Sequence, residues 1–231
     1  MEIVATGVEV AGPHGPLLEP TSLHVRSGEL LLVAGPPGSG RTALALALSG
    51  RLRPDSGTVL RNGHASPVRL RRTTAVVDSA GITEPEGSVE LSEAVAEGLG
   101  LAGRPFGRRA VHRWLSERGL HHSARKRFEQ LAPELRTRVL LDLARTARGT
   151  EALILDCPDR HGGDPLSWYT AARETATHGY AVVALCAPQT ARELNVRPIR
   201  IGSARDSGTE QPVSERTHPT PTAGTSPRTA P

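Results

Sequence analysis

The sequence predicts an α/β fold in which helices cover a buried parallel sheet and a small antiparallel sheet lies at one edge. Short apolar segments alternate along the chain with longer segments of helical periodicity, a pattern typical of parallel strands joined by helices. Several of the short segments are apolar almost throughout, as expected for strands buried on both faces. Polar and apolar residues alternate from Ile3 to Val25, which predicts the antiparallel sheet.

The elements of the main unit can be placed in chain order. The predicted strands are the apolar segments 29–35, 74–78, 152–158 and 180–186. The predicted helices carry apolar residues at helical spacing, and several end at a glycine, a common residue at helix ends; they cover 41–50, 88–100, 108–119, 134–149 and 167–179. Strands and helices therefore alternate along most of the chain.

Length and composition restrict the class of protein. The chain has 231 residues, of which 37% are hydrophobic and 23% charged, so it can bury a core without disulfide or metal support. No apolar run approaches the roughly 18 residues of a membrane-spanning helix, and we expect no transmembrane span and no secretion signal. Pro, Thr, Ser and Gly dominate from Ser203 onward. We therefore expect one folded domain over residues 1–202 and a disordered tail over 203–231.

Charge and cysteine content are less informative. The net charge is +4, and the arginine-rich run from Arg104 to Arg127 contains few aromatic residues for stacking on bases. We interpret the run as solvated helix faces, with a subunit contact or an anionic membrane contact as the alternatives, and expect no direct nucleic-acid binding. Cys157 and Cys186 lack metal-ligand spacing. They are expected to be buried small side chains, the alternative being a redox-sensitive pair on neighbouring strands.

The strongest motif is a glycine-rich loop placed between a predicted strand and a predicted helix. It matches the phosphate-loop pattern G-x-x-x-x-G-K-[ST] at every position except the lysine, and consists of Gly35, Pro36, Pro37, Gly38, Ser39, Gly40, Arg41 and Thr42. Glycines let the backbone curl so that N–H groups point at a phosphate, and the helix N-terminus adds partial positive charge. We expect Gly40 at the close approach of backbone to phosphate. The loop therefore predicts nucleotide binding.

Two residues predict a magnesium site beside this loop. Thr42 offers a hydroxyl ligand at the helix start, and Asp156 offers a carboxylate at the end of an apolar strand. The alternative for Asp156 is a capping role in the following loop. Arg41 keeps the positive charge of the missing lysine on a longer, planar side chain. We therefore expect nucleotide affinity to be retained better than catalysis.

Three segments resemble the nucleotide-binding subunit of ABC transporters over about residues 3–200. SLHVRSGELLLVAGPPGSGRT resembles the lead-in to the Walker A loop, and LALSGRLRPDSGTVLRNGH resembles the helix end and turn that follow it. LAPELRTRVLLDLARTARGTEALILDCP resembles the signature helix and the Walker B strand. The resemblance implies a P-loop NTPase fold of the RecA-like type, ATP and Mg²⁺ as cofactors, and an inserted helical subdomain at about 84–138.

The departures from the family pattern lie at its catalytic positions. The family's LSGGQ signature is Leu131-Ala132-Pro133-Glu134-Leu135 here, without the serine and both glycines. Cys157 stands where the family has its catalytic glutamate, and Cys186 near the usual switch histidine. The Q-loop glutamine aligns with Asp78, and no aromatic residue precedes the loop to stack on adenine, with His14 a weak substitute. No catalytic residue is therefore assigned with certainty.

Together, these features predict the ATP-binding subunit of an ABC transporter with slow or absent hydrolysis. The resemblance implies a separate membrane permease as partner, a homodimer or a heterodimer with a second cassette, and a cytoplasmic location at the inner face of the membrane. The alternatives are a non-hydrolysing ATP-dependent sensor or scaffold and a soluble ABC-type ATPase. The second alternative is less favoured because paired cassettes and a long coiled-coil insertion are absent from the sequence.

Overall fold

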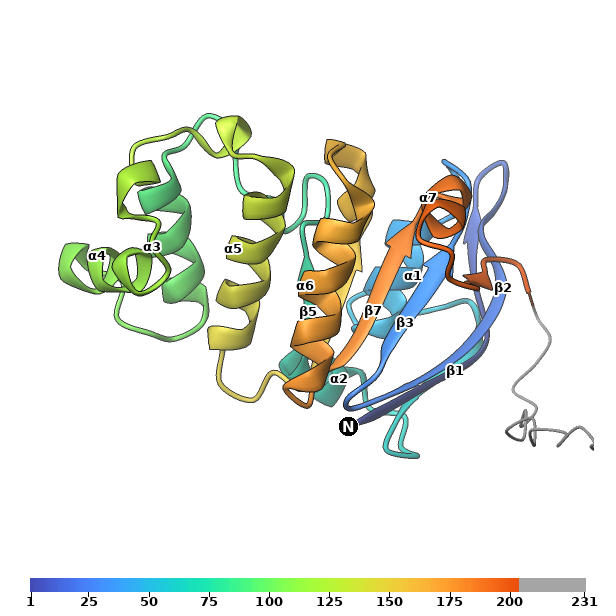
Figure 1. Ribbon diagram of the computed structural model, residues 1–231. Coiled ribbons are helices and arrows are strands. Elements are labelled where there is room, and N and C mark those ends of the chain that lie inside the picture. The colour runs from blue at the N-terminus through green and yellow to red at the C-terminus, as the bar shows by residue number, and fades with distance from the viewer. Residues whose placement is uncertain (204–231) are drawn as a thin grey trace, which may run out of the picture.

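The computed structural model describes residues 1–203 (Figure 1). Apart from Ser203, the predicted tail lies outside the described residues. The described chain forms an α/β structure with two sheets, in the element order strand, strand, strand and then helices alternating with strands. The predicted fold class is confirmed.

The main sheet has five parallel strands in the order β5-β6-β7-β3-β8. The strands are β3 (Leu30–Ala34), β5 (Thr74–Val77), β6 (Ala152–Asp156), β7 (Ala181–Cys186) and β8 (Ile199–Arg200). Every residue of β6 and β7 is buried, which explains their unbroken apolar sequences. Ala34 pairs with Cys186, and Asp156 with Leu185, so the carboxyl ends of β3, β6 and β7 lie side by side. The loops that follow these strands therefore meet at one edge of the sheet.

The second sheet is antiparallel, in the order β2-β1-β4. Its strands are β1 (Glu2–Gly12), β2 (Gly15–Arg26) and β4 (Ser56–Arg61). Helix α1 (Arg41–Leu48) packs between the two sheets, because Leu44 and Leu48 belong to one apolar cluster with Ile3, Val33 and Ile154. The predicted antiparallel edge sheet is therefore present and shares a core with the main sheet.

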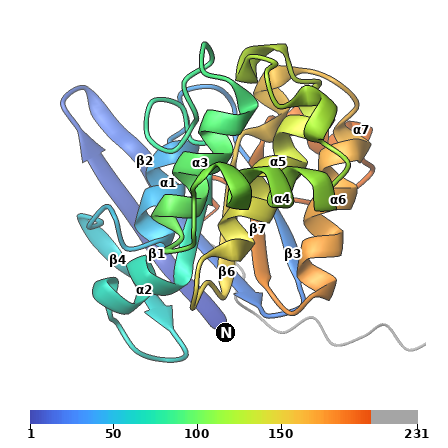
Figure 2. The ribbon, with the colours of Figure 1, turned by 90° about the vertical axis from the view of Figure 1, so that its left-hand side faces the viewer.

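Longer helices cover the opposite face of the main sheet. Helices α5 (Pro133–Thr146) and α6 (Pro165–Thr177) pack against each other there, and α3 (Leu91–Leu101) and α4 (Arg108–Glu117) lie beyond α5 (Figure 1). In the view turned by 90°, α3 and α4 lie nearest the viewer and form the outermost part of the molecule on this side (Figure 2). One continuous apolar cluster runs from Trp114 of α4 through Leu140 of α5 to Leu155 of β6. The outer helices are thus anchored to the sheet through α5.

Two short helices were missed by the sequence analysis. Helix α2 (Pro67–Thr73) and helix α7 (Pro188–Glu193) each begin at a proline, the residue favoured at the first helical position. Ser66 caps α2 by accepting a hydrogen bond from the Arg69 N–H at 3.4 Å. Six or seven residues are too few to show a helical period, so these helices depend on packing against β5 and β3.

Candidate nucleotide site

The glycine-rich loop joins the end of β3 to the start of α1, as the sequence predicts. The Gly35 N–H donates to the Cys186 carbonyl at 3.1 Å, and the Ser39 N–H donates to the Pro36 carbonyl at 3.1 Å, which closes a turn. The Leu44 N–H donates to the Gly40 carbonyl at 2.8 Å and begins the helical ladder. Within residues 1–203, the N–H groups of Arg41 and Thr42 are left without a backbone acceptor. These N–H groups and the positive end of α1 form a local environment suited to an anion.

The structure gives Gly40 a different role from the one expected. Its φ of +85° lies in the left-handed region, and a Cβ there would come 2.2 Å from the Leu17 carbonyl oxygen of β2. Gly40 is therefore required by the close passage of β2, and the space beside its Cα is occupied by protein. Gly38 also has a positive φ, +79°, but a Cβ there would meet nothing within 4 Å. The open side of the loop is thus at Gly38.

Asp156 is the centre of the polar site beside the loop. It is 1% exposed, and its Oδ2 accepts hydrogen bonds from Thr42 Oγ1 at 2.8 Å and Ser79 Oγ at 2.7 Å. Its Oδ1 accepts from Cys157 Sγ at 3.2 Å. Within residues 1–203, no arginine, lysine or histidine nitrogen lies within 4.0 Å of this carboxylate. Asp156 is a buried carboxylate that holds only neutral donors.

The residues around Asp156 are chemically suited to magnesium. A buried carboxylate normally requires a cation, and here the protein supplies none at contact distance. Mg²⁺ prefers oxygen ligands, and Thr42, Ser79 and Asp156 bring two hydroxyls and a carboxylate together. Thr42 and Asp156 were predicted for this role. Ser79 was missed, and its only sequence signal is its place directly after the Asp78 position.

Cys157 follows Asp156 in a strained, buried position. Its φ is +59°, and its N–H donates to the Leu185 carbonyl at 3.0 Å, which ties it to β7. Burial raises the pKa of the Cys157 thiol to about 12, and the Asp156 charge adds to the rise while the Arg41 charge opposes it. Cys186 is fully buried at the end of β7, and burial raises the pKa of its thiol to about 12 as well. Both cysteines are free and buried, on neighbouring strands.

Asp78 does not enter the site around Asp156, which corrects its placement there by alignment. Its φ is +61°, and its carboxylate accepts from Arg136 Nη2 at 2.8 Å and from Arg160 Nη2 at 3.1 Å. His161 Nε2 lies 3.0 Å from Asp78 Oδ2, and burial lowers the pKa of His161, so the imidazole is neutral at pH 7. Asp78 is thus the centre of a separate charge cluster, and Ser79 is the residue of this segment that faces Asp156.

The Asp78 charge cluster connects three parts of the fold. Glu84 accepts from Arg136 at 2.8 Å and pairs with Arg160 at 3.2 Å, so both arginines contact both carboxylates. Arg136 comes from α5, and Arg160 from the loop after β6. Asp78, Glu84 and His161 have the donor types of a metal site, but the two arginines already balance the two carboxylate charges. This cluster is therefore a structural crosslink.

The segment at the signature position forms the start of α5. Leu131 is buried, Ala132 is the N-cap residue, and Pro133 is the first helical residue. Ala132 has no side-chain group to donate or accept a hydrogen bond, and Pro133 has no N–H. The helix start therefore offers fewer donors to an approaching phosphate than a serine-glycine sequence would. His14, the weak substitute for an adenine-stacking residue, is exposed between β1 and β2.

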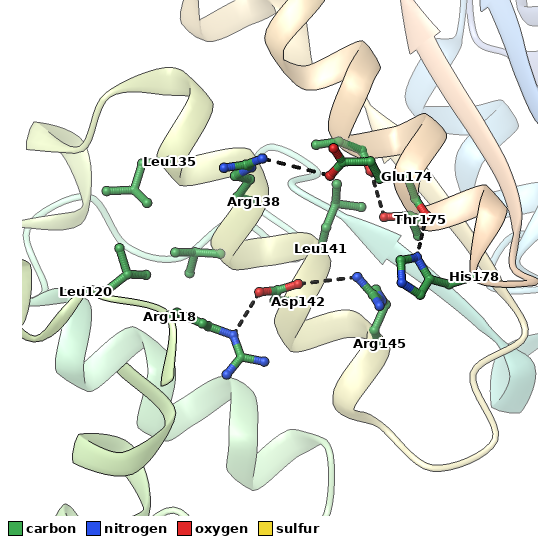
Figure 3. Close-up of a pocket in the computed structure, with 12 residues that line it drawn as sticks. Arg118, Leu120, Leu135, Arg138, Leu141, Asp142, Arg145, Glu174, Thr175 and His178 are labelled. Atoms are coloured by element: carbon green, nitrogen blue, oxygen red, sulfur yellow. Dashed lines mark hydrogen bonds and ion pairs between the residues drawn. The ribbon is translucent and has the colours of Figure 1, made fainter. Parts of the chain in front are cut away.

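A separate groove of about 340 Å³ lies where α5 and α6 meet the segment after α4 (Figure 3). Its charged side chains are paired with one another: Asp142 contacts Arg118 at 2.8 Å and Arg145 at 3.5 Å, and Arg138 lies 3.9 Å from Glu174. No residue of the glycine-rich loop lines it. The groove is therefore held by internal ion pairs and is distinct from the nucleotide site.

The chain has a phosphate-binding type of loop at the carboxyl edge of a parallel sheet. A helix follows the loop and a buried aspartate lies beside it, which is the arrangement that defines the class of P-loop nucleotide-binding domains. Within that class, the chain belongs to the ABC transporter family, because the family model described as "ABC transporter" matches residues 18–159. The chain therefore contains an ABC transporter ATP-binding domain. Among residues 1–203, no helix combines the length and apolar character needed to cross a membrane.

Relatives of known sequence are ATP-binding proteins. The chain is similar to a taurine import ATP-binding protein of Roseobacter denitrificans, with 31% identity over 64% of this chain and 54% of that protein. A hemin import ATP-binding protein of Bradyrhizobium diazoefficiens is 31% identical over 73% of this chain and 67% of that protein. An uncharacterized ABC transporter ATP-binding protein of Mycobacterium tuberculosis is 38% identical, with 64% of this chain and 21% of that protein covered. The chain thus spans about half the length of the first relative and about a fifth of the last.

Solved structures support the fold. A nucleotide-free ATP-binding cassette from an ABC transporter superposes with a TM-score of 0.63 at 17% identity, over 87% of this chain and 89% of that one. A protein from Pyrococcus furiosus named "Putative ABC transporter (ATP-binding protein)" gives a TM-score of 0.60 at 17% identity, over 81% of this chain and 92% of that one. At this identity the likeness concerns the fold.

Proposed function

We propose that this chain binds Mg-ATP at the glycine-rich loop and serves as the ATP-binding component of an ABC import system. The observation that carries the proposal is the Asp156 carboxylate, which is buried without a cationic partner and bonded to Thr42 at the start of α1. The phosphates would lie against the loop from Gly35 to Thr42 and the Arg41 side chain. The metal would be held by Thr42, Ser79 and Asp156, and when bound would neutralise phosphate charge.

We further propose that hydrolysis by this chain alone is slow or absent. At pH 7 the Cys157 side chain is a protonated thiol directed at Asp156, so it cannot orient water as a carboxylate base does. Loss of a general base usually costs about 10²- to 10⁴-fold in rate. Ala132 and Pro133 would also deprive the partner site of donors, each on the order of 10²-fold or more. The altered signature and Walker B positions therefore point to ATP binding with little turnover.

The proposed partner is a membrane permease that docks in a groove between α3, α5 and the segment after β5. The groove has a volume of about 340 Å³ and exposes Ile82 and Leu101, which are 50% and 83% accessible. Large exposed apolar side chains beside an apolar groove are typical of a helix-binding surface. The relatives named for taurine and hemin import fit such a partner, which would place the chain at the inner face of the membrane. A second cassette, from this chain or another, would complete the ATP site.

One observation favours a second candidate, a non-hydrolysing ATP-dependent scaffold. The protonated Cys157 thiol is bonded to Asp156, and the Cys157 N–H is bonded to the Leu185 carbonyl. The residue is thus held in place, and a small movement of it would not provide a general base for water. In that case ATP closes a dimer without turnover. ATPase measurements on the chain with a partner cassette separate the two candidates, because an importer needs one competent composite site.

The test of ATP binding is calorimetry with ATP and Mg²⁺, repeated in EDTA. Thr42→Val keeps the side-chain shape and removes the hydroxyl proposed to hold the metal, so we expect about 10- to 100-fold weaker binding of Mg-ATP, the value of one hydrogen-bond-type contact to a charged group. The matched control is Thr177→Val, an exposed threonine at the end of α6. If neither EDTA nor Thr42→Val changed the affinity for ATP, the proposed site would be refuted. Turnover of about 1–10 s⁻¹ by the purified chain would contradict slow hydrolysis.

A further inference from the structure

The outer end of the molecule carries a concentration of positive charge that the nucleotide site does not use. From Arg104 to Arg127 the sequence has seven arginines and one lysine but a single acidic residue, Glu117. This segment forms α4 and the loop after it, at the end of the molecule farthest from the antiparallel sheet (Figures 1 and 2). The charge is therefore gathered on one small, outlying part of the fold.

Some of these cations have structural roles. Arg104 Nε donates to the Thr146 carbonyl at 2.9 Å, and Arg118 bonds to Asp142 at 2.8 Å with its guanidinium 3.9 Å from the Trp114 ring centroid. Arg127 lies 3.8 Å from Glu129. The remaining five are exposed, and within residues 1–203 no carboxylate lies within 4.0 Å of their nitrogens. We call these five residues the cationic face: Arg108, Arg109, Arg113, Arg125 and Lys126.

The residues of the cationic face lie on α4 and on the segment that follows it. Arg109 and Arg113 are four residues apart and lie on the same side of α4. Arg108 and Arg125 line one shallow groove of about 780 Å³ between α3, α4 and the following loop. Glu90 and Glu93 also line this groove, and they lie at the start of α3, where Glu93 accepts from the Glu90 N–H at 3.3 Å and Glu90 accepts from Ser92 Oγ at 3.3 Å. The two carboxylates are thus held at the helix start, and their charges offset part of the positive charge in the groove.

One exposed aromatic side chain lies next to the cations, and an exposed leucine comes seven positions before Arg108 in the chain. Phe106 is 60% exposed, lies beside Gly100 and lines the same groove as Arg108 and Arg125. Leu101 is 83% exposed at the end of α3. Cations combined with protruding apolar side chains are typical of surfaces that contact anionic bilayers, where the cations meet headgroups and the apolar groups enter the interface.

We propose that the cationic face binds an anionic lipid surface. Charge complementarity selects an anionic occupant, and Phe106 favours a bilayer over nucleic acid, because one exposed aromatic side chain does not form a stacking platform for successive bases. The first residue of the face, Arg108, comes seven positions after Leu101 in the chain, and Leu101 lines the groove proposed for the permease. The inference goes beyond the proposed function: the chain would touch the lipid around its permease and lie in a fixed orientation against it.

The test is sedimentation of the full chain with two kinds of vesicle. One contains phosphatidylcholine alone, and the other contains about 30 to 40 mol% phosphatidylglycerol, which makes its surface anionic. The variant Arg108→Gln/Arg109→Gln/Arg113→Gln removes three cations from the face. The matched control Arg53→Gln/Arg69→Gln/Arg72→Gln removes three exposed cations near α1 and α2 that have no carboxylate within 4.0 Å among residues 1–203. Phe106→Ser tests the apolar contribution at constant charge.

We expect binding to the anionic vesicles only, weakened on the order of 100-fold by the face variant, since each of its three cations contributes about 1 kcal/mol, or about fivefold. The control variant should bind the anionic vesicles like the wild type, and Phe106→Ser should bind them more weakly. Thr42→Val should bind the vesicles normally, so a failure of the proposed ATP site is distinguishable from a failure of the proposed lipid site. Equal loss in both triple variants, or equal binding to neutral vesicles, would overturn the proposal. Arginine-dependent binding to a short DNA duplex that exceeds vesicle binding would also overturn it and assign the face to nucleic acid.

Discussion

Arg136 offers a direct test of how the helices are attached to the sheet. Its side chain is 6% exposed and bonds to Asp78 and Glu84 at 2.8 Å each, while its guanidinium lies 4.8 Å from the Phe128 ring centroid. Arg136→Ala would leave the Asp78 carboxylate, itself 5% exposed, with Arg160 and His161 as its side-chain partners. The variant therefore removes one of two cations from a pair of carboxylates in which Asp78 is buried and Glu84 is 28% exposed.

The expected loss of stability follows from this geometry. Breaking a buried ion pair by deleting one partner costs about 3 to 5 kcal/mol, because a charge is left uncompensated. Arg160 still contacts both carboxylates but is 23% exposed, so we expect the lower end, about 3 kcal/mol. For a domain of this size, that corresponds to a fall in Tm of about 6 to 12 °C. Asp78→Asn in the Arg136→Ala background should recover part of the loss, because it removes the orphaned charge.

The measurement is urea unfolding followed by circular dichroism at pH 7, for each single variant and the double variant. Arg138→Ala is the control on the same helix, since this side chain is 65% exposed and only 3.9 Å from Glu174, and it should change stability by less than about 0.5 kcal/mol. If Arg136→Ala cost no more than Arg138→Ala, or if Asp78→Asn gave no recovery, the cluster would not be the crosslink described above.

Three further predictions concern the core, the thiols and the tail. Phe128→Ala should cost about 3 to 5 kcal/mol in urea unfolding, because the ring is fully buried and its loss leaves a cavity; a loss below about 1 kcal/mol would contradict this. The pKa values of the Cys157 and Cys186 thiols are raised from 9.0 to about 12, so the stability that the protonated thiols contribute is complete below pH 9 and falls between pH 9 and 12. Both thiols should resist a thiol reagent at pH 8 until the chain unfolds. Labelling of the native protein would refute their burial. Truncation after residue 202 should leave the unfolding free energy within about 1 kcal/mol of the full chain, and a larger loss would show that 203–231 packs on the domain.

The sequence was sufficient for the sheet and the phosphate loop because both are encoded locally. Strands such as β6 and β7 are buried on both faces and so read as continuous apolar runs, and the loop needs glycines at fixed spacing. Asp156 could be found because it is the last residue of such a strand. These features depend on a few neighbouring residues, and the sequence pattern therefore predicts them well.

The parts that escaped prediction depend on contacts between distant residues. Ser79 reaches Asp156 across 77 positions, and Asp78 is neutralised by Arg136 across 58 positions. Asp78 and Cys157 are two of the four non-glycine residues at positive φ among residues 1–203, and no local sequence pattern indicates these backbone conformations. Gly40 was expected at the phosphate, but its neighbour is Leu17 of β2, which only the packing of the two sheets reveals.

The strand order of the main sheet has a consequence for synthesis of the protein. Strand β3, which leads into the phosphate loop, is hydrogen-bonded to β7, with Leu30 opposite Val182, and to β8 on its other side. About 150 residues must therefore leave the ribosome before β3 meets its first partner, which takes roughly 8 to 30 s at ordinary translation rates. During that time the apolar strand and its open edge are exposed to chaperones and to other nascent chains. A chain that stalls before residue 181 would have the complete phosphate-loop sequence but no formed nucleotide site.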